Sequence, residues 1–381
     1  MQVSGGDVVV VGAGLIGLAI AFELAERGAS VRVYDRAEPG RGASWAGAGM
    51  LAPHSERLED EAMLGIGASS LAQYPGFVER VRAASGMDSR LHLDGIVHTA
   101  FDSDRLEDLR GIERALHARG VACDLLDRRL VLAAEPALRP GVLGGLVVHG
   151  EGWVDNRRLG RALTAACQAR GVRMARSAEI AVECDSRRAL GVRTSLGFVA
   201  ASAVVNACGA WAAALEGVPP LCRPPVEPVK GQMLAIGAPD AFLRRTTWVP
   251  GAYLVPRGDG RLLVGATMER TGFDERVTAA GVHGLLAAAL AAAPSLGSFT
   301  VTESWAGLRP GTPDGRPFIG PTALEGFFLA TGHFRNGILL APATARLVAD
   351  AIEKGARHGL EAFGLARFGT EEAAAARMAR S

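Results

Sequence analysis

The chain of 381 residues is long enough for a large hydrophobic core and for two domains of ~100–200 residues each. Its 41 basic and 40 acidic residues nearly balance, so no net field would draw it to nucleic acid or acidic lipid, and neither partner is expected. The 5 cysteines are odd in number and have no ligand-like spacing, which favours reduced thiols in the cytoplasm and excludes a disulfide framework or a cysteine metal site.

The apolar run that begins at Val8 does not predict a membrane anchor. Glycines interrupt it and Glu23 ends it, so it is too short to span a bilayer. No membrane partner is therefore expected. No bound metal is expected either, because the cysteines lack ligand-like spacing.

Residues 7–35 predict a strand, a glycine turn, a helix and a second strand. The run Val8–Val11 is typical of a strand buried on both faces of a parallel sheet. Apolar residues then recur at helical spacing from Leu15 to Phe22, and Val31–Tyr34 forms the next strand. This order is the one that a dinucleotide-binding βαβ unit requires.

The glycines of this unit have a chemical role. Gly12 permits a tight turn, Gly14 lets a pyrophosphate approach the helix N-terminus, and Gly17 lets helix and strand pack closely. Asp35, at the end of the second strand, is placed to accept hydrogen bonds from ribose hydroxyls, and its charge would repel a 2′-phosphate. The unit thus predicts an adenine dinucleotide other than NADP but does not separate FAD from NAD.

Three later stretches are candidates to face the cofactor. Residues 40–50 are mostly small, which suits backbone running against a ligand but equally suits a plain loop. The strand at 203–208 ends in an uncharged glycine turn, although an ordinary buried strand would read the same way. The strand at 326–332 leads through a glycine-containing turn into a helix, and Pro342 is expected in the first turn of that helix.

Five segments together resemble the D-amino acid oxidase family of FAD-dependent oxidoreductases, and within it the branch that oxidises glycine for thiamine biosynthesis. They are VVVVGAGLIGLAIAFELAERG at the N-terminus, GAGMLAPHSE at 47–56, GAYLVPRGDGRLLVGATM at 251–268, WAGLRPGTPDGRPFIG at 305–320 and GHFRNGILLAPATARLVAD at 332–350. The resemblance makes FAD, rather than NAD, the expected cofactor.

The resemblance, with the several short strands between 226 and 302, implies an α/β fold of two domains. A Rossmann-like FAD-binding domain would carry an inserted α+β substrate domain built on an antiparallel sheet. We assign residues 1–87, 148–214 and 305–381 to the FAD-binding domain, and residues 88–147 and 215–304 to the substrate-binding domain.

The resemblance also implies the catalytic and substrate-binding residues. Arg309 and Tyr253 would bind the substrate carboxylate, a role for which the guanidinium fork is well suited. Met50 and Met268 would keep the pocket small, and the backbone carbonyl of Arg335 would receive the amine. Without the family, Arg309 would be interpreted as part of a surface ion pair, and Tyr253, Met50 and Met268 as core residues.

Carried over in the same way, the expected FAD contacts come from four parts of the chain. They are Gly12, Ala13, Gly14, Leu15, Ile16, Gly17, Asp35, Arg36, Ala43, Ser44, Gly47, Gly49, Met50, Gly209, Trp211, Arg309, His333, Arg335, Asn336, Gly337, Ile338 and Leu339. Sarcosine oxidases attach FAD to a cysteine late in the chain, whereas the last cysteine here is Cys222, so noncovalent FAD is expected.

The implied reaction is oxidation of glycine, and of sarcosine or small D-amino acids, by hydride transfer from the α carbon to flavin N5. It would give glyoxylate or another oxoacid, ammonia and hydrogen peroxide, and would serve thiamine (thiazole) synthesis. The resemblance further implies a homo-oligomer, such as a tetramer. The alternatives are a quinone-linked D-amino acid dehydrogenase, a sarcosine oxidase-like enzyme with noncovalent FAD, a nicotinamide-linked dehydrogenase and a flavoprotein without enzymatic activity.

Overall fold

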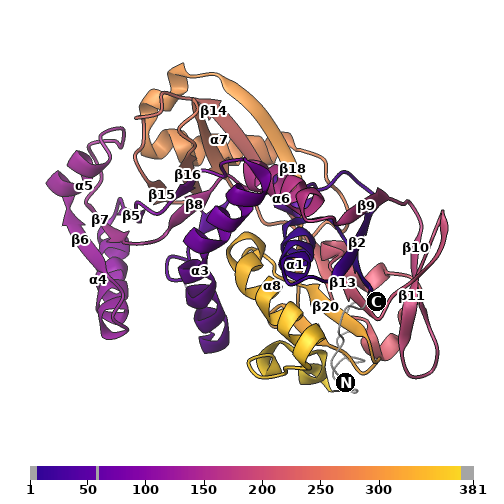
Figure 1. Cartoon of the computed structure of the whole chain (residues 1–381). Coiled ribbons are helices and arrows are strands. Elements are labelled where there is room, and N and C mark those ends of the chain that lie inside the picture. The colour runs from indigo at the N-terminus through magenta and orange to yellow at the C-terminus, as the bar shows by residue number, and fades with distance from the viewer. Residues whose placement is uncertain (1–6, 57–59, 370–381) are drawn as a thin grey trace.

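The computed structural model describes residues 7–56 and 60–369 (Figure 1). One of its two large sheets has six strands in the order β19-β20-β13-β1-β2-β9. Neighbouring strands are parallel except for the edge pair β19–β20. The strands are β1 (Asp7–Val11), β2 (Ser30–Asp35), β9 (Arg173–Arg176), β13 (Ala203–Asn206), β19 (Phe318–Pro321) and β20 (Phe327–Thr331).

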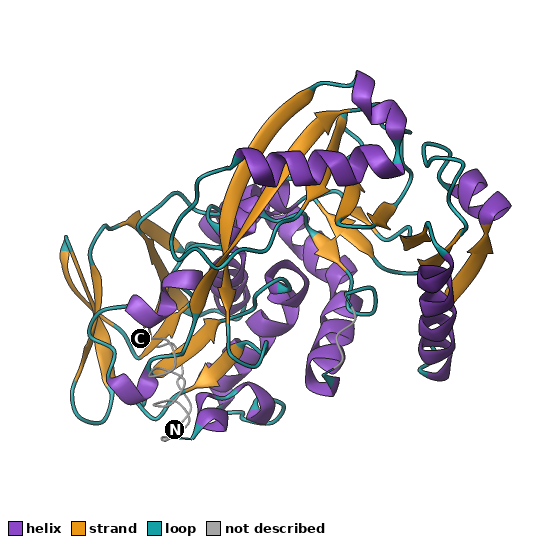
Figure 2. Cartoon of the chain, turned by 180° about the vertical axis from the view of Figure 1, so that it is seen from behind, coloured by secondary structure: helices purple, strands orange, loops and turns teal. Residues whose placement is uncertain are grey.

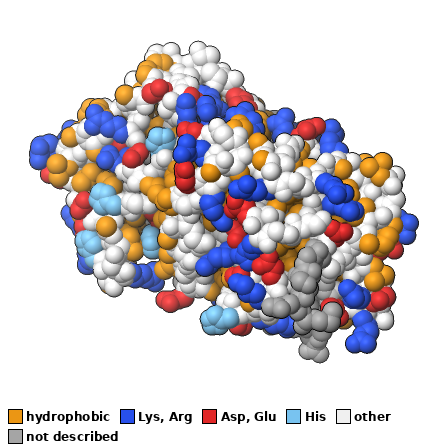
Figure 3. Space-filling model, in the orientation of Figure 1, with side chains coloured by type: hydrophobic (Ala, Val, Ile, Leu, Met, Phe, Trp, Pro, Cys, Tyr) orange, Lys and Arg blue, Asp and Glu red, His pale blue; other side chains and the backbone are white. Residues whose placement is uncertain are grey.

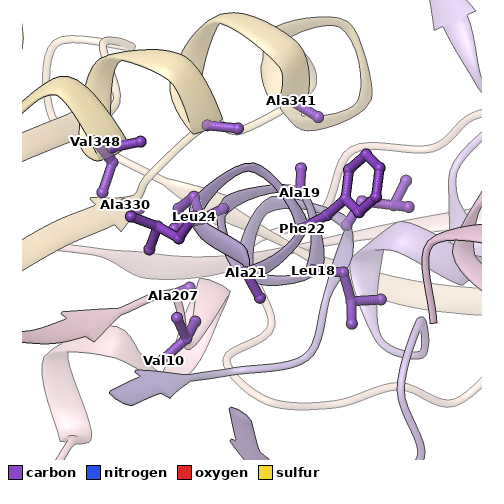
Figure 4. Packing of buried hydrophobic residues seen from close by; sticks show 14 of the residues in the cluster. Val10, Leu18, Ala19, Ala21, Phe22, Leu24, Ala207, Ala330, Ala341 and Val348 are labelled. Atoms are coloured by element: carbon purple, nitrogen blue, oxygen red, sulfur yellow. The ribbon is translucent and has the colours of Figure 1, made fainter. Parts of the chain in front are cut away.

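Strand β1 is buried on both faces, as its run of valines predicts. Val8 and Val10 belong to the apolar cluster that contains the helices, whereas Val9 and Val11 belong to a second cluster on the other face. The helices of the first cluster are α1 (Leu15–Glu26), α3 (Glu61–Ser85), α6 (Asn156–Ala169) and α8 (Gly337–Lys354). Figure 4 shows α1 between α8, which contributes Ala341 and Val348, and the sheet side, where Val10 lies on β1 and Ala207 directly follows β13.

The second large sheet has eight strands in the order β18-β14-β17-β16-β15-β5-β7-β6. Its pairs are antiparallel except β15–β5, which is parallel, so the predicted antiparallel sheet contains one parallel contact. Helix α7 (Ala279–Ala292) packs across its strands (Figure 2). The strands are β5 (Ile96–Ala100), β6 (Cys123–Asp127), β7 (Gly144–Val148), β14 (Glu227–Gly237), β15 (Thr246–Val249), β16 (Ala252–Pro256), β17 (Arg261–Gly265) and β18 (Val301–Gly311).

Shorter elements complete the chain. Figure 1 places α4 (Ser103–Ala118) and α5 (Arg128–Ala134) at one end of the molecule and the three-stranded sheet of β10–β12 at the other. The remaining strands are β3 (Met50–Leu51), β4 (Leu91–His92), β8 (Gly152–Val154), β10 (Ile180–Cys184), β11 (Ala189–Thr194) and β12 (Gly197–Ala200). The remaining helical turns are α2 (Ala43–Ala46), η1 (Gly209–Ala214), η2 (Pro220–Cys222), η3 (Pro294–Ser298), η4 (Glu361–Phe363) and η5 (Leu365–Phe368).

The predicted domain division can be placed on these sheets. Every strand of the six-stranded sheet falls in a segment assigned to FAD binding, while the proposed boundaries at 147/148 and 304/305 fall inside β7 and β18. The division stays a prediction. Its residues 1–6, 57–59 and 370–381 lie outside the described part of the chain.

One sequence prediction about α8 is wrong. The helix begins at Gly337, so Pro342 is its sixth residue and lies beyond the first turn. Proline is tolerated without cost only within the first turn. The glycine-containing turn at 332–337 predicts that a helix follows, but it does not show at which residue the helical hydrogen bonds begin. A proline at this position requires compensation from neighbouring groups.

The surface carries charges of both signs. Figure 3 shows basic and acidic side chains interspersed over one face, in keeping with a net charge of +1. Within the described ranges, no helix combines the length and the apolar character needed to cross a bilayer.

Candidate cofactor and substrate site

A cavity of about 790 Å³ is lined by residues of both large sheets. The ends of β1 and β2 form one part of its wall, and β14, β16, β17 and β18 form another. Its volume is in the range of ordinary ligand sites. The cavity therefore joins the predicted dinucleotide site to the predicted substrate site.

The glycine turn after β1 packs as tightly as the βαβ interpretation requires. Gly12 has a φ of +109°, and a Cβ there would lie 2.3 Å from the carbonyl oxygen of Ala207. A Cβ on Gly17 would lie 1.9 Å from the carbonyl oxygen of Gly12. A side chain at Gly12 would therefore collide with the backbone after β13, and one at Gly17 would push α1 away from the glycine turn.

The N-terminus of α1 is suited to an anion. Its cap residue, Gly14, lines the cavity together with Ile16, and its first turn, Leu15–Leu18, has no acidic side chain that would neutralise the positive end of the helix dipole. Ser44 Oγ accepts a hydrogen bond from Leu15 N–H at 2.9 Å. This bond ties residues 43–46 to the helix start.

The carboxylate of Asp35 is fixed at the end of β2. Its Oδ2 accepts from Ala13 N–H at 2.6 Å and its Oδ1 from Ala37 N–H at 2.8 Å. A carboxylate has about four acceptor positions, so two remain for ribose hydroxyls. Nearby on the cavity wall, the Arg36 guanidinium lies 3.9 Å from the centre of the Trp211 ring.

Most of the predicted site residues line this cavity. They are Gly12, Gly14, Ile16, Asp35, Arg36, Ala43, Ser44, Gly47, Gly49, Met50, Gly209, Trp211, Tyr253, Met268, Arg309, His333, Arg335, Gly337 and Ile338. The other predicted residues, all in the described part of the chain, are buried but are not among the residues that line the cavity: Ala13, Leu15, Gly17, Asn336 and Leu339.

At the substrate end, Arg309 and Tyr253 lie over glycines of neighbouring strands. A Cβ on Gly231 of β14 would lie 2.2–2.4 Å from guanidinium atoms of Arg309. A Cβ on Gly265 of β17 would lie 2.5–2.6 Å from ring atoms and the hydroxyl of Tyr253. Arg309 Nη1 donates to the carbonyl oxygen of Thr267 at 3.1 Å, which helps to fix the guanidinium.

The protonation of these two side chains suits carboxylate binding. Burial raises the pKa of Tyr253, so its hydroxyl remains a donor at neutral pH. Burial lowers the pKa of Arg309, and the nearby Tyr253 and Glu56 oppose that effect. A buried cation beside a phenol is an attractive site for a small anion.

Glu56 is a residue that the sequence did not reveal as part of the site. It lines the cavity, its side chain is 7% exposed, and its Oε2 lies 2.7 Å from Nη2 of Arg335. Burial raises the pKa of Glu56, whereas Arg335 and Arg309 act in the opposite direction. In the sequence, only its position at the end of the 47–56 segment could have indicated that Glu56 belongs to the site. The fold is needed to show that Glu56 faces Arg335.

The remaining predicted side chains play different parts. His333 is buried and its Nε2 lies 3.0 Å from Thr344 Oγ1, while burial lowers its pKa to about 3. It is therefore a neutral support at the start of α8. Met50 is half-buried in the wall, whereas Met268 is 60% exposed and lies at the rim.

Comparison with known proteins now identifies the class. The family model described as "FAD dependent oxidoreductase" matches residues 7–351, so the chain belongs to this family and its cofactor is FAD. This result confirms the predicted enzyme class and the α/β fold with an FAD domain and a sheet-based substrate domain.

Particular relatives can also be named. The chain is 38% identical to glycine oxidase of Pseudomonas putida over 91% of this chain and 94% of that protein. It is 37% identical to the bifunctional protein ThiO/ThiG of a Synechocystis species, over 91% of this chain but 51% of the relative. The crystal structure of glycine oxidase from Geobacillus kaustophilus superposes with a TM-score of 0.89 and 35% identity, covering 96% of this chain and 99% of that one.

Proposed function

We propose that this protein oxidises glycine with oxygen and water to glyoxylate, ammonia and hydrogen peroxide. The observation that carries the proposal is the meeting of Arg309 and Tyr253 in a cavity continuous with the βαβ glycine turn. The similarity to glycine oxidases over nearly the whole chain supports the same substrate.

Arg309 and Tyr253 would bind the carboxylate of the amino acid. Charge-assisted hydrogen bonds contribute about 1.5–3 kcal/mol each, and two of them fix the orientation of the substrate as well as its position. A carboxylate anchored in this way leaves the α carbon at a defined distance from the anchor. The catalytic contribution of the two residues is thus mainly orientation.

The pocket wall would limit the size of the substrate. Met50 and Trp248 line the cavity near Tyr253, and the ring centres of Trp248 and Tyr253 are 5.5 Å apart. One methyl group changes binding by only ~1–3 kcal/mol, so sarcosine and small D-amino acids should be slower substrates rather than excluded ones. The backbone carbonyl of Arg335 would receive the amine, as the family pattern suggests.

FAD, when bound, supplies the acceptor for the hydride of the α carbon and passes the electrons to oxygen. The start of α1 and Asp35 would hold its pyrophosphate and ribose. The N-terminus of α8 at Gly337 lies on the same wall and would stabilise negative charge on the reduced ring. We propose that the attachment is noncovalent.

A role in thiamine synthesis rests on the ThiO/ThiG relatives. An imine formed from glycine is a reactive carbon–nitrogen unit that a thiazole-forming step could use before water hydrolyses it. A cytoplasmic homo-oligomer, such as a tetramer, is proposed from the family resemblance alone.

Oxygen consumption by the purified protein tests this function. With glycine we expect oxygen uptake, equal amounts of peroxide and glyoxylate, and slower turnover of sarcosine and D-alanine. Turnover that requires a quinone and leaves oxygen unconsumed would instead establish the dehydrogenase alternative.

A further inference from the structure

Helix α8 has a defect close to the cavity. Pro342 has no N–H, so the carbonyl of Ile338, four residues earlier, lacks its normal donor within the helix. Ile338 itself lines the cavity, one residue after the helix start at Gly337. The turn that faces the cavity is therefore the turn that the proline weakens.

Helix α3 supplies the missing hydrogen bond. The hydroxyl of Tyr74 donates to the carbonyl oxygen of Ile338 at 2.5 Å. Tyr74 is completely buried, at 0% exposure, and burial raises the pKa of its hydroxyl, so this donor keeps its proton at neutral pH.

Ser70, one turn away on α3, makes a second pair of hydrogen bonds to the backbone of α8. Its Oγ donates to the carbonyl oxygen of Leu339 at 2.6 Å and accepts from the N–H of Ala343 at 3.2 Å. These two backbone groups are four residues apart, so they are the partners of one helical hydrogen bond. Ser70 is also at 0% exposure, so water does not replace its hydroxyl.

We propose that Tyr74 and Ser70 are positioning residues that hold the first turns of α8 against the FAD site. Residues four apart on a helix share one face, so α3 presents both hydroxyls to α8 together. The proposal rests on the placement of FAD at the start of α8 given under the proposed function. Neither hydroxyl belongs to a residue that lines the cavity, so both act through the backbone of α8.

The test uses full-length holoprotein and the substitution Tyr74→Phe, which keeps the ring and removes the donor. FAD affinity is measured by diluting each holoprotein and following the fluorescence of released flavin. We expect Tyr74→Phe to weaken FAD binding about tenfold, because a buried carbonyl without a donor favours rearrangement of its turn. Ser70→Ala tests the same claim with a smaller deletion and should weaken FAD binding in the same direction.

Two further variants make the result specific. Pro342→Ala gives residue 342 an N–H that can bond Ile338, so in this background Tyr74→Phe should change FAD affinity less than about twofold. Ser85→Ala is the matched control, since Ser85 also lies on α3 but its hydroxyl donates to the carbonyl oxygen of Val81 and accepts from Met87 N–H, at the end of α3. It should leave FAD affinity unchanged.

The outcomes separate positioning from simple stability. An equal loss of FAD affinity from Tyr74→Phe in both backgrounds would overturn the proposal. So would a lower unfolding temperature with unchanged FAD affinity. Because the readout is FAD release rather than turnover, a wild-type protein that binds FAD but does not oxidise glycine would refute the substrate and leave this test intact.

Discussion

At the scale of single residues, we predict that substrate binding depends most on Arg309. Replacement by Lys keeps the charge but loses the planar fork that can pair with both carboxylate oxygens. We expect Arg309→Lys to raise the KM for glycine by about 10- to 100-fold, because one charge-assisted hydrogen bond to the carboxylate is lost. Steady-state kinetics would show this, and flavin content should remain that of the wild type.

Glu56 gives a second prediction, about charge selectivity. Glu56 pairs with Arg335 at 2.7 Å, so the Arg335 guanidinium is not available to a second carboxylate on a larger substrate. Iminodiacetate is glycine with a second carboxymethyl group on its nitrogen, and in Glu56→Gln the Arg335 guanidinium becomes free to bind that second carboxylate. The ratio of kcat/KM for iminodiacetate to kcat/KM for glycine should therefore rise about tenfold. Glu303→Gln is the control, because Glu303 pairs with Arg157 and is not among the lining residues in the described part of the chain. An unchanged ratio in Glu56→Gln would show that this ion pair does not restrict the substrate.

At the scale of elements, β14 and β17 pass beneath the side chains that we propose bind the substrate, Arg309 and Tyr253. An Ala side chain at Gly231 would occupy the place of the Arg309 guanidinium. We expect Gly231→Ala to raise the KM for glycine as strongly as Arg309→Lys does, while FAD stays bound. Gly284→Ala in α7 is the control, since a Cβ there meets nothing within 4 Å. Normal glycine kinetics in Gly231→Ala would contradict this packing.

The segment that carries Glu56 is held by another buried acid. Glu151 Oε1 accepts from His54 N–H at 2.6 Å, and burial raises the pKa of Glu151 from 4.5 to about 7. The folded protein thus binds this proton more tightly than the unfolded chain, so the free energy of unfolding should fall as pH rises from about 4.5 to 7.

Urea unfolding of wild type and Glu151→Gln between pH 5 and 8 measures that effect. The wild type should lose on the order of 3 kcal/mol more stability over this range than the variant, because Gln has no proton to release. Parallel pH profiles for the two proteins would show that Glu151 does not titrate in this way.

The sequence predicted those parts of the site that depend on local order. Gly12, Gly17 and Asp35 belong to one strand–turn–helix–strand unit, and their roles follow from spacing along the chain. Glu56 and Gly231 could not be found in this way, since each acquires its role from a side chain distant in the sequence. The same holds for the carbonyl of Ile338, whose donor comes from α3.

At the scale of the whole molecule, the cofactor is expected to join parts of the chain that are far apart. The cavity wall combines residues 11–56, 207–216 and 307–338 with strands of the other sheet. Bound FAD should therefore stabilise the entire fold, by about 4 kcal/mol when its concentration is 1,000 times its Kd. Thermal unfolding with and without added FAD measures this, and an unchanged Tm would count against a site that spans both sheets.

Noncovalent attachment has its own measurement. Acid precipitation should release all flavin into the supernatant as FAD, because the fold and not a covalent bond would retain it. Flavin that remains with the precipitated polypeptide would require a covalent link and would correct the proposal.

An anaerobic visible spectrum shows whether this FAD-dependent oxidoreductase uses glycine as its substrate and oxygen as its acceptor. We predict that glycine bleaches the flavin band of the purified protein and that air restores it. A band that glycine does not bleach would contradict the substrate, and a bleached band that air does not restore would contradict oxygen as the acceptor.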